Sequence, residues 1–465
     1  EISQNLGEAG YINANVRIVT TLRHEDGLVD VDLEVSPGRI IYVRRINFEG
    51  NFETSDQVLR RELLQLESSI SSSSLIELGK VNLQRLGFFS SVRVVLKPVE
   101  GLEDQVDIVY EVKEAPSGSI SASIGFSPGQ GILLGASLSQ KNFLGTGNSV
   151  SFALNRSSSL REARFGFTNP YFTADGVSRG IDLYYRETQF DEVNTSDYTT
   201  DETGIALNLG YPISPSSRVS GSLVLQKLVL KTGIYSPTEV IDFLNDQGAT
   251  SSLEGNEFYE VLLGGSVRRD TRNKAFFATE GVLHKVGLTS TVPKSKLEYY
   301  IFSYRGERYE PLSKTRNISL KIASQFGYGD GFGDSNSLPF FKNFFAGGLT
   351  SIRGFDFNSL GPVNSLGEPF GGNVFIKGTA AVQSPMPGID SDQQTRLSFF
   401  LDGGNVFNSD IFSGDLDLEE LRFSTGLAFS WITPVGPLSF IYAKPLNQKL
   451  GDQPESFQFA LGQTF

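Results

Sequence analysis

The residues of this chain that could do chemistry are few and far apart. The 465 residues include no cysteine, which excludes disulfides, thiolate metal sites and a cysteine nucleophile. The two histidines, His24 and His284, are too distant in sequence to suggest a zinc site, and His284 has no evident serine or aspartate partner. The glycine series 327–333 lacks the lysine and following helix of a phosphate-binding loop. We therefore expect no enzyme, no metal site, no cofactor and no nucleotide partner.

One motif with chemical potential is Ser351-Ile352-Arg353-Gly354-Phe355, which lies in a long connection of about residues 327–373. An arginine beside a glycine can be a solvated turn. Alternatively, the loop folds back into an interior and Arg353 meets a carboxylate on the wall. Residues 397–402 alternate so that Asp402 faces inward when Leu401 faces outward. Asp402 is then a candidate for a bidentate contact with Arg353, and both interpretations stay open.

A second motif is Arg268-Arg269-Asp270-Thr271-Arg272-Asn273, which we place at a turn between two strands. Its candidate residues are Arg269, Asp270 and Arg272. Opposite charges two or three residues apart are typical of a solvated turn in which the side chains pair locally. This interpretation is preferred over a binding site when the motif is taken alone.

The elements that must position these residues are strands. Residues 116–465 contain 46 of the 53 aromatic residues and 41 of the 49 glycines, but no apolar run near the ~20 residues that a membrane helix needs. Their apolar residues instead recur at every second position. Sixteen such segments can be counted, around residues 120–126, 134–138, 150–154, 163–167, 181–185, 205–211, 219–225, 259–267, 282–288, 297–301, 318–326, 374–382, 397–401, 423–431, 438–442 and 457–465.

An even strand number and an aromatic excess favour a membrane barrel over a water-soluble sandwich. The predicted fold class is therefore membrane all-β, with a 16-stranded antiparallel transmembrane β-barrel over residues 116–465. The two long connections, about 231–257 and 327–373, both follow odd-numbered strands and so share one rim. Because outer-membrane barrels carry long loops outside and short turns in the periplasm, we expect these two loops to be extracellular and the N-terminal modules to be periplasmic.

The first 115 residues contain a repeat with an offset of 76 to 77 residues, as Gly10-Tyr11 and Gly87-Phe88 show. Residues 38–115 read as a complete β-α-α-β-β module, and residues 1–37 as the C-terminal part of a truncated one. Thr54 with Gln57, and Ser74 with Glu77, have the spacing of capping boxes before two helices, the first of which would bury Leu59, Leu63 and Leu66. The modules are either rigid spacers or surfaces that accept a strand from a partner.

Closure of the barrel joins its first and last strands. The last strand places Phe457, Phe459, Leu461 and Phe465 on one side and is interrupted by Gly462, which weakens strand packing. The first strand is short and rich in small residues. The seam is either an ordinary closed ladder or a weak one whose opened edge could template a new strand. The candidate gate residues are Ser119, Ile120, Ile124, Gly125, Phe459, Gly462 and Phe465.

The whole chain resembles the BamA family of outer-membrane β-barrel assembly proteins. The module resembles the last POTRA domain of that family through Ile46-Asn47-Phe48-Glu49-Gly50-Asn51. The matches in the barrel are Asn142-Phe143-Leu144-Gly145-Thr146-Gly147, Asn169-Pro170-Tyr171-Phe172, Arg269-Asp270-Thr271-Arg272-Asn273, Arg353-Gly354-Phe355 and Phe400-Leu401-Asp402-Gly403-Gly404-Asn405.

The resemblance implies that Arg353 anchors the sixth extracellular loop through Asp402, with a second acid on the twelfth strand, where this chain has Ala381. It also implies a lateral gate between the first and last strands, in the outer membrane of a Gram-negative bacterium. The implied partners are unfolded outer-membrane β-barrel proteins, accessory assembly lipoproteins and outer-membrane lipid, with no nucleic acid. The function would be insertion of client barrels. The alternative is a POTRA-barrel transporter that secretes a partner protein through the lumen, as in two-partner secretion or TamA-like proteins.

Overall fold

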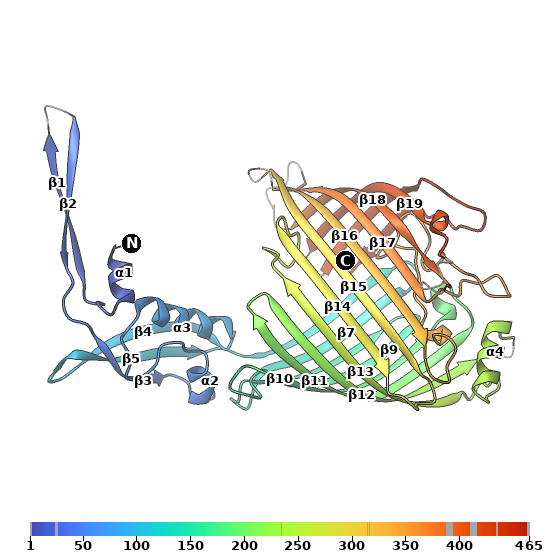
Figure 1. Cartoon of the computed structure of the whole chain (residues 1–465), viewed down its shortest axis with the longest axis horizontal. Helices are drawn as coiled ribbons and strands as arrows, with labels where there is room; N and C mark the ends of the chain where they lie inside the picture. The colour runs from blue at the N-terminus through green and yellow to red at the C-terminus, as the bar shows by residue number, and fades with distance from the viewer. Residues whose placement is uncertain are drawn as a thin grey trace. The chain divides into compact units, whose positions relative to one another are not determined.

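The computed structural model describes residues 2–23, 27–233, 235–313, 315, 317–386, 394–409, 416–433 and 436–462. These residues form two compact units (Figure 1). The first unit comprises residues 1–119 with 139–150, and the second comprises residues 120–138 with 151–465.

The first unit begins with helix α1 (Ile2–Glu8) and the hairpin of β1 (Asn15–Arg23) and β2 (Leu28–Ser36). A three-stranded sheet follows, in the order β3-β5-β4. Its strands are β3 (Tyr42–Glu49), β4 (Phe89–Val99) and β5 (Leu102–Glu114), with helices α2 (Asp56–Arg60) and α3 (Ser73–Arg85) between β3 and β4. This is the predicted β-α-α-β-β order.

The module core lies between the helices and the sheet. Leu59, Leu83, Ile108 and Tyr110 are fully buried there. The Tyr110 hydroxyl donates a hydrogen bond to the carbonyl of Ile76 at 3.2 Å, so its one polar atom is satisfied. Burial raises the pKa of Tyr110 to about 12, and the phenol stays neutral.

The helix starts differ from both predicted capping boxes. Helix α2 starts after Ser55 and ends at Arg60, so it is too short to carry Leu63 and Leu66. The N-cap of α3 is Ser72, whose hydroxyl accepts from the backbone N–H of Leu75. Ser and Thr recur through these segments, and spacing alone could not identify which hydroxyl is the cap because several neighbours offer the same chemistry.

The second unit is a closed antiparallel barrel of sixteen strands, as predicted, and one strand, β7, together with the ends of β6 and β8, is shared with the first unit. The strands are β6 (Gly118–Ser127), β7 (Gly131–Phe143), β8 (Asn148–Arg156), β9 (Leu160–Asn169), β10 (Ser178–Gln189), β11 (Tyr198–Ser214), β12 (Ser217–Thr232), β13 (Asn256–Asp270), β14 (Gly281–Thr291), β15 (Tyr299–Ser313), β16 (Ile318–Gly331), β17 (Val374–Ser384), β18 (Thr395–Phe407), β19 (Arg422–Thr433), β20 (Gly436–Pro445) and β21 (Phe457–Leu461).

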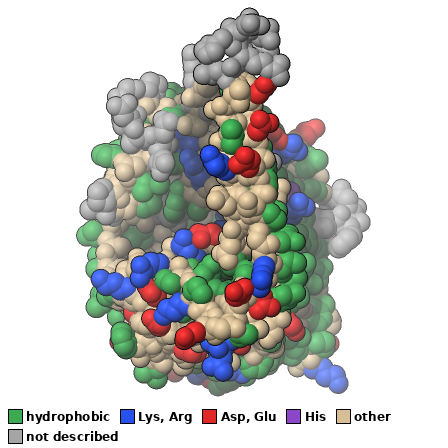
Figure 2. Space-filling model, turned by 90° about the vertical axis from the view of Figure 1, so that its left-hand side faces the viewer, with side chains coloured by type: hydrophobic (Ala, Val, Ile, Leu, Met, Phe, Trp, Pro, Cys, Tyr) green, Lys and Arg blue, Asp and Glu red, His purple; other side chains and the backbone are tan. Residues whose placement is uncertain are grey.

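The outer surface of the barrel is apolar. Phe399 and Leu401 on β18, and Leu427 on β19, are exposed although they are large. The space-filling view shows broad apolar areas along the flank of the molecule (Figure 2). This pattern is what a barrel surrounded by hydrocarbon requires. None of the helices among the described residues is long and apolar enough to span a membrane.

The two long connections share one rim of the barrel, here called the long-loop rim. The first, between β12 and β13, contains helix α4 (Thr238–Asp246). The second, between β16 and β17, contains the 3-10 helix η2 (Phe340–Lys342). Two other 3-10 helices at this rim are η1 (Asp191–Val193) and η3 (Leu418–Glu420).

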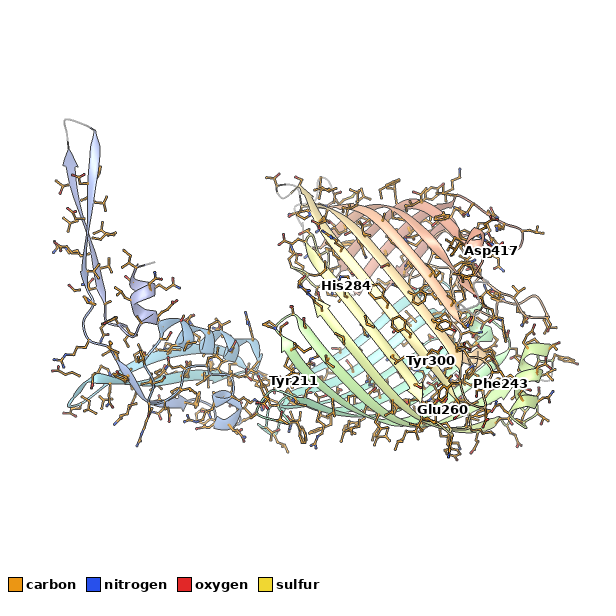
Figure 3. All side chains as sticks on the ribbon, viewed as in Figure 1. Tyr211, Phe243, Glu260, His284, Tyr300 and Asp417 are labelled. Carbon is orange, nitrogen blue, oxygen red and sulfur yellow. The ribbon has the colours of Figure 1, made fainter. Side chains whose placement is uncertain are left out.

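An apolar cluster fills the barrel interior beneath this rim, and period-two reasoning missed it. Phe340 and Phe341 of η2 pack there against Phe243 of α4, which is labelled in Figure 3. Leu297 and Tyr299, whose alternation suggested an outward face, are buried in the same cluster. The inner face of these strands is apolar near the rim because the loops cover it, whereas the outer face carries charged pairs such as Lys227 with Glu257.

Candidate functional site

Arg353 lies inside the barrel and holds Asp402 with two hydrogen bonds. Its Nε donates to Asp402 Oδ2 at 2.6 Å and its Nη2 to Oδ1 at 2.7 Å. Asp402 is completely buried, and the Thr379 hydroxyl donates to its Oδ1 at 2.8 Å. The guanidinium also stacks on the Phe400 ring, 3.4 Å from the ring centroid. A bidentate, charge-assisted pair with a stacked face is a rigid arrangement, and the structure brings the two candidate residues together.

Gly354 and Phe355 connect this pair to the last strand of the barrel. Gly354 has a φ of +89°, and an added Cβ would lie 3.1 Å from the Cβ of Ala443, so both conformation and space favour glycine. The Phe355 side chain is fully buried, and its carbonyl accepts from the Gln458 side chain on β21 at 2.9 Å. The Glu455 backbone N–H donates to the Gly354 carbonyl at 3.0 Å. The loop motif therefore holds β21 from inside the lumen.

Sequence reasoning missed three partners of this motif: Thr379, Phe400 and Gln458. Alternation could have identified both Phe400 and Thr379 as lumen-facing. Phe400 lies two residues before Asp402 on β18, and Thr379 lies directly opposite Asp402 on β17. Gln458 had no such signal, since its importance depends on where the loop returns. Ala381, at the position where the resemblance implied a second acid, is buried and lies opposite Lys321 in the β16–β17 register.

A cavity of about 340 Å³ lies beside the pair and is lined by more cations than acids. Lys377 reaches the carbonyl of Thr350 at 3.0 Å. The charged residues of its lining are Arg272, Arg305, Lys321, Arg353, Lys377 and Glu307. Asp402 and Glu307 therefore face five cations, and of these two carboxylates Asp402 is the one that holds the loop.

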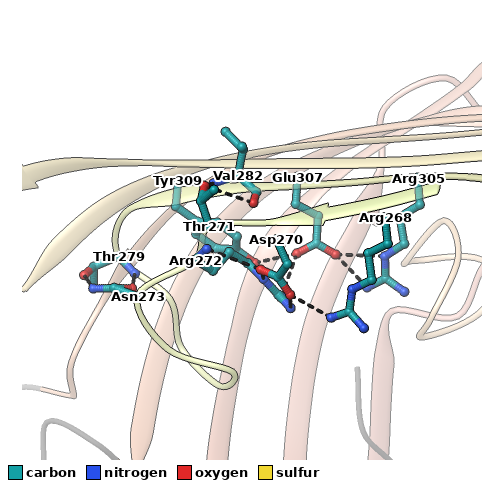
Figure 4. A network of polar contacts seen from close by, with 10 residues as sticks. All are labelled: Arg268, Asp270, Thr271, Arg272, Asn273, Thr279, Val282, Arg305, Glu307 and Tyr309. Carbon is teal, nitrogen blue, oxygen red and sulfur yellow. Dashed lines mark hydrogen bonds and ion pairs between the residues drawn. The ribbon is translucent and has the colours of Figure 1, made fainter. Parts of the chain in front are cut away.

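The motif at the β13–β14 turn forms a network rather than a freely solvated turn (Figure 4). Asp270 accepts from Arg268 at 2.7 Å and from Arg272 through two contacts of 2.9 Å. Arg272 also forms an ion pair at 3.4 Å with Glu307, a residue of β15 that is almost fully buried. Arg269 is exposed and lies outside the network. The turn motif thus braces β13 against β15, and two of its three candidate residues, Asp270 and Arg272, do so.

The ladder at the seam between β21 and β6 is very short over the described residues. There, β21 pairs with β20 at five positions but with β6 at one, Leu461 opposite Phe126. By comparison, β11 and β12 pair at sixteen positions. The rings of Phe126 and Phe459 stack across the seam with centroids 6.1 Å apart. Side chains therefore supply much of what the backbone ladder lacks.

The other gate candidates lie along β6 or directly after β21. Gly462 has a φ of +76°, and an added Cβ on it would lie 3.1 Å from the Cα of Gly125. Ile120 and Ile124 on β6 are exposed, as is Ser119. Phe465 lies outside the described residues. Much of β6 consequently presents backbone groups with no partner on β21 among the residues described, which is the geometry of a strand edge.

The first unit contains a further polar site around Glu114 at the end of β5. Its carboxylate accepts from the backbone N–H groups of Thr54 at 2.7 Å and Glu53 at 3.1 Å. Burial acts to raise the pKa of Glu114, but the hydrogen bonds from Thr54 and its neighbours outweigh burial and lower it. The Thr54 hydroxyl, which sequence reasoning had assigned to a helix cap, accepts from Asn142 at 2.8 Å. The turn 142–147 thereby belongs to the same compact unit.

The described residues include no group of three or more His, Asp or Glu side chains that could hold a metal ion. What the barrel offers instead is a rigidly anchored internal loop next to a poorly paired strand edge. Such an edge can accept an added strand by main-chain hydrogen bonding.

Comparison with known proteins agrees with this geometry. Residues 142–465 match the Omp85 superfamily domain, and residues 41–115 match the POTRA family, described as a surface antigen variable number repeat. A relative from Neisseria meningitidis serogroup B, outer membrane protein assembly factor BamA, is 34% identical over 100% of this chain and 62% of its own length. The BamA of Nitratidesulfovibrio vulgaris is 25% identical over 100% of this chain and 56% of its own length.

Among solved structures, BamA from Haemophilus ducreyi lacking POTRA domains 1–3 superposes with a TM-score of 0.87 at 30% identity, covering 100% of this chain and 92% of that one. The chain spans about 60% of the length of the curated relatives named above. Since the Omp85 model alone matches well over half of the residues, the chain belongs to the Omp85 superfamily.

Proposed function

We propose that this chain is the membrane-inserting part of a factor that folds β-barrel proteins into the outer membrane. The barrel lies in the outer membrane and the POTRA module in the periplasm. Curated relatives are named outer membrane protein assembly factors. The observation that carries the proposal is the seam, where β21 and β6 share one pair among the described residues. The unpaired edge of β6 would template the first strand of a client.

The module would receive unfolded client barrels, and accessory lipoproteins would bind it. We infer no enzymatic step. The driving force is the folding of the client itself, because its apolar surface enters lipid and its backbone ladder is completed there. The loop held by Arg353 and Asp402 would keep the lumen blocked and would support β21 through Gln458 while the seam opens.

The test is a disulfide across the seam. The sequence has no cysteine, so Phe126→Cys with Leu461→Cys introduces the only thiols. Oxidation is expected to lower client insertion into vesicles at least tenfold, and a reductant should restore it. A matched pair across a continuous ladder, Leu223→Cys with Leu263→Cys, should leave insertion unchanged. Insertion at the original rate through a fully oxidised seam would contradict the gate.

A transporter that secretes one partner protein through the lumen is the alternative. Depletion separates the two functions, since loss of an insertase lowers the amounts of many unrelated outer-membrane barrels. Loss of a dedicated transporter would lower secretion of one protein and leave those barrels in place.

A further inference from the structure

A shallow apolar groove lies on the outer face of the barrel, across strands β6 to β10. Its volume is about 590 Å³. Its floor consists of three outward-facing alanines, Ala122, Ala136 and Ala163, where neighbouring outward positions carry large side chains. Leu134, Leu154 and Tyr185 form its walls. The groove exists because small residues stand beside large ones on adjacent strands, not because the barrel bends.

Two arginines stand at the end of this groove nearest the long-loop rim. Arg156 is the last residue of β8 and Arg161 is the second residue of β9, and both line the groove. The Ser157 N–H donates to the Leu160 carbonyl at 2.7 Å and closes the hairpin between them. Ser157 therefore lies opposite Leu160, and the next antiparallel pair away from the turn is Arg156 opposite Arg161. Like charges directly opposite each other are destabilising unless something compensates them.

Glu162, an acid in the lining of the groove, pairs with Arg186 at 2.8 Å. The other nearby carboxylates compensate only one of the two arginines. Glu187 on β10 pairs with Arg161 at 3.1 Å. Asp201, the next acid along the sheet, is paired with Lys231 at 2.6 Å. Arg156 is exposed and makes no hydrogen bond or ion pair among the residues that the structure describes. One positive charge therefore remains unbalanced at the mouth of an apolar groove.

The geometry points to a binding site for an anionic lipid of the outer leaflet, with its phosphate on Arg156 and Arg161 and an acyl chain along the alanine floor. An outward arginine at the membrane interface costs little, whereas one at mid-depth is strongly destabilising. The groove thus matches a phosphate at the interface and a hydrocarbon chain below it. This inference uses the outer-membrane location but not the insertase activity, so its test is independent of client insertion.

The test measures lipid binding to the full chain in neutral detergent, by native mass spectrometry. The probe is phosphatidic acid with saturated chains, and the comparison probes are diacylglycerol and inorganic phosphate. The starting protein is expected to retain phosphatidic acid and neither comparison probe. Arg156→Ala should weaken retention about tenfold, as expected for one charge-assisted hydrogen bond.

Two further variants keep the inference falsifiable. Ala136→Leu with Ala163→Leu fills the floor without changing charge and should weaken retention as well. Lys227→Ala is the matched control, because it removes an exposed cation of β12 away from the groove. Lys227 pairs with Glu257 at 2.6 Å. Retention of phosphatidic acid by Arg156→Ala or by the filled variant at the level of the starting protein would overturn the lipid site. Equal binding of inorganic phosphate would show a free-anion site instead, and equal binding of diacylglycerol would show an apolar surface without headgroup recognition.

Discussion

The anchor of the Arg353 loop and the seam between β21 and β6 differ sharply in how firmly they are held. Around Arg353, a buried carboxylate, a bidentate cation and a stacked ring hold the loop to β18. At the seam, one backbone pair joins β21 to β6 among the described residues. Gln458 connects the two regions, because it lies on β21 and donates to the loop carbonyl of Phe355.

This difference shows that the last strand is held from two directions with different strengths. Its inner side is tied to a loop that is itself rigidly anchored, while its free edge is almost unpaired. Under the proposed function, this arrangement would let β21 separate from β6 while the loop keeps it in the barrel. The following predictions change one side of the comparison at a time, from the largest expected effect to the smallest.

The largest effect is expected from Asp402→Leu, which leaves the Arg353 cation inside the lumen without its carboxylate. Breaking one partner of a buried pair costs about 3 kcal/mol or more. The free energy of unfolding in detergent, measured with urea, checks this. Adding Arg353→Met should recover part of the loss, because no uncompensated charge remains. Glu310→Leu, which removes an exposed partner of Arg308, should change stability by about 0.5 kcal/mol or less.

The next effect is expected from Gly125→Ala at the seam. An added Cβ there would collide with the carbonyl oxygen of Leu461 and displace the one described pair. We expect hydrogen exchange of β6 and β21 to rise about tenfold or more, since a strained contact costs about 1–3 kcal/mol. Gly265→Ala is the matched strand glycine with nothing within 4 Å, and it should leave exchange unchanged. Equal exchange in both variants would mean that the pair does not close the seam.

A smaller effect is expected from Gln458→Ala, which removes the connection between loop and seam. Loss of this hydrogen bond should cost about 1 kcal/mol, because the Phe355 carbonyl keeps only its second donor, the Gly348 N–H at 3.0 Å. Exchange should rise in β21 but not at Asp402, because the Arg353 pair remains. Gln325→Ala, which removes a glutamine that lines the cavity and does not contact the loop motif, is the control. A rise at both sites would show that β21 and the anchor unfold together.

The smallest effect is a pH dependence of the module. The hydrogen bonds from Thr54 and Glu53 lower the pKa of Glu114 despite the opposing effect of burial. A carboxyl group whose pKa is lower in the folded state stabilises that state above its unfolded pKa, and this stabilisation is lost as the pH falls through the folded pKa. Protection of the Thr54 amide should therefore decrease in acid. Glu114→Gln should flatten the dependence, whereas the exposed Glu103→Gln should preserve it.

Most of the architecture could be predicted from the sequence alone. Alternating apolar residues revealed sixteen strands because each strand has one face in lipid and one in the lumen, and both environments select side chains with period two. The same alternation placed Asp402 inward, and the repeat identified the module. The capping boxes were wrong because several adjacent hydroxyls satisfy the same spacing.

The tertiary structure decided what happens where elements distant in sequence meet. The apolar cluster of Phe243, Leu297 and Phe340 depends on two loops covering the lumen, so its residues break the alternation. Gln458 acts on the loop only because residues about one hundred positions apart share the lumen. The single pair of Leu461 with Phe126 depends on how the barrel closes, which no local pattern records. Local periodicity therefore determined the strands of this protein, whereas closure and loop return determined its anchor and its seam.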